Sequence, residues 1–82
     1  MGSLRKVINV KGETPFQVDA ESFGLSKSAQ GYTLAYSIDG DHYTEYETPV
    51  PADEELVIND VVPGMFFKCI GNTDTIHCLF KK

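Results

Sequence analysis

The amino-acid sequence predicts an all-β fold, a seven-stranded antiparallel β-sandwich that forms one domain over residues 1–82. Turn-forming residues recur roughly every eight to twelve positions, and the segments between them alternate apolar and polar side chains. The length allows one domain, and a hydrophobic content of 41% is typical of a chain with a packed core. These observations favour two stacked sheets over a helical or disordered chain.

The first two strands are expected at Arg5–Val10 and Phe16–Ala20. Successive side chains of a strand point to opposite faces of its sheet. The residues expected to face the core are therefore Ile8, Val10, Phe16, Val18 and Ala20. The segment Glu21–Gly31 shows no clear period and holds two glycines and three serines. It is predicted to be a connection that crosses between the sheets, with a single turn of helix as the alternative.

A hairpin is predicted in the middle of the chain. Its first strand, Tyr32–Ile38, alternates strictly, so one face should carry Tyr32, Leu34, Tyr36 and Ile38. The sequence "DGDH" then predicts a tight turn in which Gly40 adopts a positive φ. The second strand of the hairpin is expected at Tyr43–Thr48.

Three further strands are predicted after this hairpin. The segment Pro49–Glu55 is excluded from a central strand, because two prolines remove hydrogen-bond donors and three acidic side chains resist burial. The remaining strands are expected at 56–60, 65–71 and 75–80, with a turn at "VVPG" between the first two of them.

The last two strands are expected to form a hairpin around "GNTD". Cys69 would then lie across from Cys78, and Phe67 across from Phe80, with all four side chains on one face. A disulfide in this register would stabilise the fold by about 2 to 3 kcal/mol. We expect free thiols instead, because directly cross-strand disulfides are geometrically demanding and small disulfide-dependent domains usually carry several.

The net charge of −5 disfavours nucleic acid as a partner, since binding to phosphates requires clustered lysines and arginines. No apolar run approaches the roughly 18 residues of a membrane span, so no membrane partner is expected. Between Lys27 and Lys68 the chain has no lysine or arginine. The acidic residues in that interval are Asp39, Asp41, Glu45, Glu47, Asp53, Glu54, Glu55 and Asp60. If the terminal strands are neighbours, a basic edge opposes an acidic middle, which either steers docking or merely maintains solubility.

No motif predicts an enzyme or a cofactor. The cysteines and histidines lack the spacing of a zinc site, and the twelve-residue calcium loop of an EF-hand is absent. Asp39 and Asp41, with Glu45 and Glu47 nearby, would supply carboxylates for calcium, but turn chemistry already explains the "DGD" sequence. We therefore expect no metal and no catalytic residues.

The four tyrosines flank the central hairpin. Tyr32 and Tyr36 fall on its apolar face and are expected in the core. Tyr46 alternates with Glu45 and Glu47, so either the tyrosine or the glutamates face solvent. An exposed Tyr43 or Tyr46 would anchor a protein partner or stack on a sugar, whereas core packing is the alternative for each.

Two resemblances to known families extend this interpretation. The hairpin "YTLAYSIDGDHYTEY" resembles that of discoidin-like carbohydrate-binding modules, which are β-sandwiches. The wider pattern of "RKVINVKGETPFQV", "PVPADEELVIND" and "VVPGMFFKCIGNTD" resembles small Ig-like sandwich proteins in the virions of tailed bacteriophages. That resemblance implies a seven-stranded Ig-like antiparallel β-sandwich that serves as an auxiliary or decoration subunit on the capsid. It implies no catalytic residues.

The predicted function is that of a non-enzymatic structural protein located in the virion, which binds coat or other virion proteins in multiple copies. A module that binds a host-surface glycan through Tyr43 and Tyr46 is the main alternative, and a calcium-dependent adhesion domain is a third. The candidate binding residues are Tyr43, Tyr46, Asp53, Glu54, Glu55, Arg5 and Lys6. The two basic residues and the acidic Pro49–Glu55 segment would form opposite poles of the contact with a coat lattice.

Overall fold

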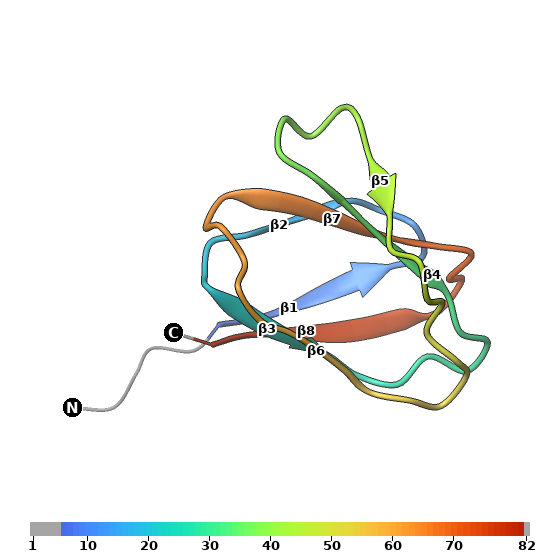
Figure 1. Ribbon diagram of the computed structural model, residues 1–82. Coiled ribbons are helices and arrows are strands. Elements are labelled where there is room, and N and C mark those ends of the chain that lie inside the picture. The colour runs from blue at the N-terminus through green and yellow to red at the C-terminus, as the bar shows by residue number, and fades with distance from the viewer. Residues whose placement is uncertain (1–5, 82) are drawn as a thin grey trace.

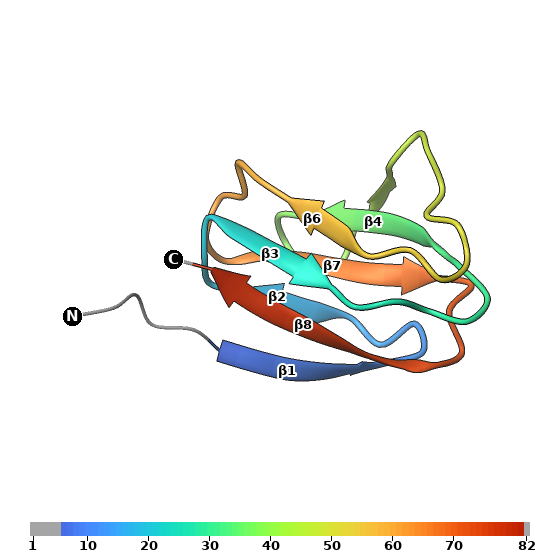
Figure 2. The same ribbon diagram turned by 90° about the horizontal axis from the view of Figure 1, so that it is seen from below.

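Two antiparallel sheets of four strands pack face to face (Figures 1 and 2). The structure is a computed structural model that describes residues 6–81. Sheet A contains, in spatial order, β1 (Lys6–Lys11), β8 (Thr75–Lys81), β3 (Ser22–Leu25) and β6 (Leu56–Ile58). Sheet B contains β2 (Phe16–Val18), β7 (Met65–Ile70), β4 (Thr33–Ser37) and β5 (Thr44–Glu45). The all-β sandwich predicted from the sequence is confirmed.

The chain is arranged as one long antiparallel ribbon with its tip at the turn between β4 and β5. Moving away from that tip, β4 pairs with β5, β3 with β6, β2 with β7 and β1 with β8. The ribbon is rolled so that β8 also pairs with β3, and β7 with β4. Eight strands rolled in this way form a jelly roll. The order departs from that of immunoglobulin-like sandwiches, in which the last two strands are neighbours in one sheet.

The prediction of seven strands is wrong, because the expected connection Glu21–Gly31 contains β3. This short strand reads Ser-Phe-Gly-Leu, and its Phe23 and Leu25 are buried while Ser22 and Gly24 are partly exposed. The alternation is present but covers only four residues and is interrupted by a glycine. The segment does cross between the sheets as expected, since it leaves sheet B after β2, forms β3 in sheet A and returns to sheet B.

The core lies between the sheets and is centred on three phenylalanines. The ring centroids of Phe23 and Phe67 are 4.7 Å apart, and Phe16 lies 6.0 Å from the first and 6.1 Å from the second. The inward residues predicted for the first two strands are confirmed: Val10, Phe16, Val18 and Ala20 are buried, and Ile8 is partly buried against them. The alternation of side chains therefore assigned these faces correctly.

Strand β4 ends earlier than the sequence predicts. Tyr32 and Leu34 are buried and Tyr36 packs against the core, as expected. Ile38 was expected beside them, but it is 81% exposed. The reason is local: the Ser37 hydroxyl accepts a hydrogen bond from the Gly40 amide at 2.9 Å, so the turn begins at Ser37 and turns the next residue outward.

The predicted hairpin of the last two strands is wrong, because β7 and β8 belong to different sheets. Cys69 lies opposite Leu34, and Cys78 lies opposite Ile8 and Leu25. The four side chains expected on one buried face nevertheless all face the core: Phe67, Cys69, Cys78 and Phe80. Both cysteines are free thiols, as expected, and burial raises the pKa of each to about 12.

A buried asparagine explains why the chain crosses between the sheets after β7. The Asn72 side chain is 2% exposed, and its amide donates to the carbonyls of Gly12 at 3.0 Å and Asp74 at 2.9 Å. Its oxygen accepts from the Ser28 hydroxyl at 2.9 Å. These bonds hold the segment around Asn72 against the β1–β2 turn and against the connection between β3 and β4. The chain therefore continues across the sandwich. An unpaired buried amide would be destabilising, so the contacts act as a set.

The other strands begin and end close to their predicted positions, with shorter regular pairing. The strand expected at Tyr43–Thr48 is regular only at β5, and the strand expected at 56–60 only at β6. Tyr32 precedes β4 and forms an isolated antiparallel bridge with Val50.

Candidate functional site

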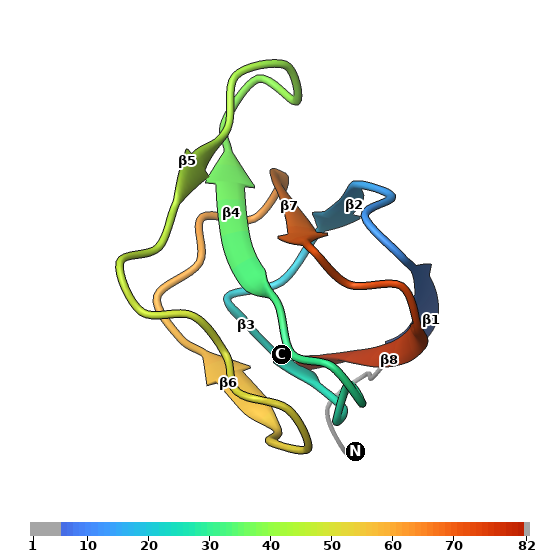
Figure 3. The same ribbon diagram turned by 90° about the vertical axis from the view of Figure 1, so that its right-hand side faces the viewer.

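A hollow of about 550 Å³ runs along the side of the sandwich where β5 and β6 form the edges of their sheets. The segment that connects these strands follows this side (Figure 3). The hollow, called the acidic groove below, is lined by Tyr46, Glu47, Thr48, Pro49, Val50, Pro51, Glu54, Glu55 and Leu56. Three candidate residues from the sequence, Tyr46, Glu54 and Glu55, therefore meet in one place.

Backbone contacts fix the wall of the groove. Tyr32 and Val50 exchange both of their backbone hydrogen bonds, at 3.0 and 2.7 Å, and the Asp53 amide donates to the Ser28 carbonyl at 2.8 Å. The close approach depends on Gly31, whose φ is +76° and whose absent Cβ would lie 2.7 Å from the Val50 carbonyl oxygen. Any side chain at this position would push the wall outward.

Tyr46 forms the inner wall of the groove. Its ring meets the Tyr36 ring edge to face, with centroids 5.4 Å apart, and it packs partly buried against the core. The Tyr46 amide also donates to the Leu34 carbonyl at 2.9 Å. Burial raises the pKa of the Tyr46 hydroxyl, so this group is neutral and available as a hydrogen-bond donor at physiological pH.

The rim of the groove carries charge of one sign. Glu47, Glu54 and Glu55 are exposed, and no lysine or arginine is among the residues of 6–81 that line the groove. Carboxylates around an apolar floor create a local negative potential that attracts cations and cationic surfaces. The groove is thus suited to a ligand with both apolar and basic groups.

Tyr43 lies elsewhere, on the outer face of sheet B. Its ring covers the Lys68 ammonium, which is 4.4 Å from the ring centroid, and its hydroxyl is buried without a hydrogen-bond partner. Burial of that hydroxyl raises its pKa. Since Tyr46 packs against the core side, the structure does not bring Tyr43 and Tyr46 together into one stacking platform.

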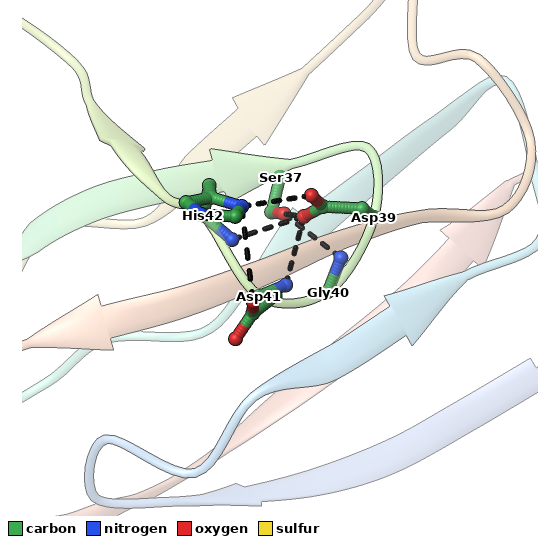
Figure 4. Close-up of polar contacts among 5 residues, drawn as sticks. All are labelled: Ser37, Asp39, Gly40, Asp41 and His42. Carbon is green, nitrogen blue, oxygen red and sulfur yellow. Dashed lines mark hydrogen bonds and ion pairs between the residues drawn. The ribbon is translucent and has the colours of Figure 1, made fainter.

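The acidic tip of the hairpin satisfies its own carboxylate (Figure 4). One oxygen of Asp39 accepts from the amides of Asp41 at 2.8 Å and His42 at 2.9 Å, and from the Ser37 hydroxyl at 2.9 Å. The other oxygen lies 2.9 Å from His42 Nδ1. Hydrogen bonds from the His42 amide and ring, then from Asp41 and Ser37, lower the pKa of Asp39 below its ordinary value. The Asp39 carboxylate therefore organises the turn.

Residues 6–81 contain no group of three or more metal-binding side chains arranged to hold an ion. The same residues hold no helix with the length and apolarity of a membrane crossing.

The predicted charged poles lie at opposite edges of sheet A. β1 pairs with β8, so the terminal strands are neighbours as the charge argument required. Lys6 is exposed on edge strand β1, with its ammonium 5.8 Å from the centroid of the Phe80 ring. Asp53, Glu54 and Glu55 are exposed beside β6, at the other edge. Arg5 lies outside the described residues.

Sequence reasoning did not identify the apolar part of the groove. Pro49, Val50, Pro51 and Leu56 were treated as parts of a connection and a strand, although they supply the floor and wall. The available signal was Val50, an apolar residue between two prolines, which is 7% exposed because it pairs with Tyr32. A buried residue within a polar connection indicates that the connection is held against the core.

No family model, curated protein or solved structure matches this chain. Its function therefore has to be inferred from its own residues.

Proposed function

We propose that this chain is a non-enzymatic interaction protein that docks through the acidic groove onto a basic surface of a partner present in many copies. Its most specific form is an auxiliary or decoration subunit on a bacteriophage capsid. The observation that carries the proposal is the convergence of an apolar floor and three carboxylates in one groove, at the edge of sheet A opposite the basic strand β1.

The groove combines two contributions to binding. Tyr46, Pro49, Pro51 and Leu56 offer apolar surface, which supplies affinity when it is buried by a partner. Glu47 and Glu54 at the rim select partners with lysine or arginine and accelerate the encounter. A partner segment with apolar residues between basic ones would fit both features.

A capsid partner is supported by the jelly-roll strand order, which differs from the Ig-like order that the resemblance to virion proteins of tailed bacteriophages implies, and separately by the sequence pattern that carries this resemblance. Jelly rolls occur in viral capsid domains and in lectins. On a lattice, a shallow groove would gain strength from the presentation of many identical sites.

The proposal is tested with phage particles assembled without this chain. Purified chain is added to the particles, and the bound copies are counted by quantitative gel analysis and cryo-microscopy. We expect saturable binding that the double variant Glu47→Lys/Glu54→Lys reduces at least about tenfold, because both rim charges are reversed. Glu21→Lys is the control for each charge reversal, since Glu21 is exposed and does not line the groove.

Two results would contradict the proposal. If the particles bind no wild-type chain, the chain is not a capsid subunit. If the double variant binds as well as wild type, the groove is not the docking site.

Carbohydrate binding remains the second candidate, because Tyr46 lines the groove beside carboxylates that accept hydrogen bonds from hydroxyl groups. It predicts binding on a glycan array that Tyr46→Ala removes and Tyr43→Ala retains, since Tyr43 lies on another face. An array without binding would reject this candidate.

A further inference from the structure

The outer face of sheet A carries a row of apolar residues that is exposed at its two ends and partly exposed at Leu79 and Gly24 in the middle. Val7 lies opposite Leu79, Leu79 opposite Gly24, and Gly24 opposite Val57, so the row crosses all four strands. Val7 is 60% exposed and Val57 is 53% exposed. A continuous exposed apolar row is a stronger indication of an interface than scattered single residues.

Gly24 leaves a hollow in the middle of this row. A hollow of about 330 Å³ is lined by Val7, Gly24, Val57 and Leu79 together with two further leucines and four polar neighbours: Leu25, Leu56, Ser26, Glu55, His77 and Lys81. The backbone does not require glycine here, because a Cβ at Gly24 would lie 3.6 Å from its nearest neighbour, the Leu56 carbonyl oxygen, which is ordinary contact. Glycine in a strand often marks a site where another group approaches closely.

A polar row lies along one side of the apolar row. His77 Nδ1 is 2.8 Å from the Asn9 side-chain oxygen, and the His77 amide donates to the Ser26 hydroxyl at 2.8 Å. Glu55, beside β6, belongs to the same polar row. It precedes Val57 by two residues, and side chains two positions apart point to the same face of a sheet. An apolar centre bordered by hydrogen-bonded polar groups is the usual composition of a protein interface.

We propose that this face binds a second copy of the chain about a two-fold axis that runs parallel to the strands, between β8 and β3. Leu79 of each copy then enters the hollow over Gly24 of the other, and Val7 of each copy meets Val57 of the other. A two-fold axis along the apolar row would instead place Leu79 against Leu79 and leave the two Gly24 positions facing each other. The fit of Leu79 into the hollow over Gly24 therefore favours the first axis. About this axis the two sheets pack face to face with their strands aligned.

Charge complementarity supports the same axis. It places β1 of one copy over β6 of the other, twice in the dimer. Lys11 is exposed and, by alternation from Val7, points outward at the end of β1. It would face the acidic segment Asp53–Glu55 of the other copy. Opposite charges at the border of an interface favour this orientation over others.

The size of the face predicts a weak dimer. Four strands about 4.8 Å apart and about five residues long give a flat area of roughly 300 Å² for each copy. A stable complex usually buries about 800 Å² for each partner. Association is therefore expected only at high concentration, such as that of copies held side by side on a larger assembly.

Sedimentation equilibrium of the full chain, up to about 1 mM, tests the proposal. We expect the average mass to rise from 9.1 kDa toward twice that value as concentration increases. Amide NMR shifts should change with concentration at Val7, Gly24, Val57 and Leu79. A chain that stays monomeric at the highest concentration would overturn the proposal, as would growth beyond a dimer or shifts confined to the acidic groove.

Two variants locate the contact. Val57→Lys should raise the dimer dissociation constant at least about tenfold, because it buries a charge in the apolar row. Ile38→Lys is its matched control, since Ile38 is 81% exposed and lies outside this face. Gly24→Thr should have the same effect as Val57→Lys by filling the hollow, with a circular dichroism spectrum like that of wild type. Equal effects of Val57→Lys and Ile38→Lys, or no effect of Gly24→Thr, would contradict the proposed packing.

Discussion

The outer faces of the two sheets differ in how far the chain covers them. Sheet B covers its own face: Tyr43 lies over Lys68, and the turn at Gly40 approaches Phe66 so closely that a Cβ there would be 3.2 Å from the ring. Ala35 in the middle of this face is fully buried, although it is not part of the core between the sheets. On sheet A, Val7 and Val57 remain exposed.

The difference follows from the position of the ribbon tip. The tip joins β4 and β5, which both belong to sheet B, so its residues fold back over that sheet. Sheet A contains β3 and β6, which follow β4 and β5 along the ribbon, and β1 and β8, which form the far end of the ribbon. An apolar row on such a sheet is available to a partner, which is why the face of sheet A carries the inference of a second copy.

The substitution Ala35→Leu should have the largest effect on this comparison. Because Ala35 is fully buried beneath the side chains of the outer face, three added carbons have no space, and we expect the free energy of unfolding to fall by about 1 to 3 kcal/mol. Urea denaturation measures this change. Ala52→Leu is the control, since Ala52 is exposed. An Ala35→Leu variant as stable as wild type would show that the outer face of sheet B is not closed.

The sequence predicted which side chains face the core better than it predicted which strands pair. The inward positions of Val18, Leu34, Phe67 and Phe80 follow from alternation, which is a local property of each strand. Pairing is not local. β7 and β8 are separated by only four residues, yet they belong to different sheets. The hydrogen bonds of Asn72 with Gly12 and Ser28 hold the connecting segment where it crosses between the sheets.

The acidic groove could be predicted only in part. The negative charge of Glu54 and Glu55 was readable from composition, whereas alternation left open whether Tyr46 or the neighbouring glutamates face solvent. Their convergence depends on the close approach of Gly31 to Val50, which meet where the pairing of β4 with β5 continues beyond the regular strands to the bridge between Tyr32 and Val50. Tyr43, three residues before Tyr46, lies on another face because side chains an odd number of positions apart in an extended segment point to opposite sides.

Gly24→Thr should have a smaller effect and of the opposite sign. We expect the free energy of unfolding of the monomer to rise by about 0.5 to 1 kcal/mol, because glycine loses more backbone entropy on folding than other residues and the outward position has room for a side chain. Urea denaturation at micromolar concentration measures the monomer alone. Gly71→Thr is the control that distinguishes the effect of available space from the effect of backbone conformation. A side chain at Gly71 would have no neighbour within 4 Å, but φ is +91°, so the free energy of unfolding should fall. A loss of stability in Gly24→Thr would mean that the face of sheet A is closed in the monomer.

The smallest effect is expected at the tip that covers sheet B, and it should depend on pH. Hydrogen bonds from His42, Asp41 and Ser37 lower the pKa of Asp39 in the folded state, whereas an unfolded aspartate titrates at about 3.9. The ionised carboxylate therefore stabilises the fold fully above the unfolded pKa, and this stability is lost as the pH falls through that value toward the folded pKa. Asp39→Asn removes it, so the variant should be less stable than wild type at pH near 7 and approach wild type in acid.

Urea denaturation of Asp39→Asn and wild type across this pH range measures the effect, with Asp41→Asn as the control. The Asp41 carboxylate is exposed and lies 3.8 Å from His42 Nδ1, so its removal should change the pH dependence little. If the Asp39→Asn and wild-type curves run parallel, the carboxylate does not hold the turn. If they converge in acid and the near-ultraviolet signal of Tyr43 weakens in Asp39→Asn, the hydrogen bonds of Asp39 maintain the cover over sheet B.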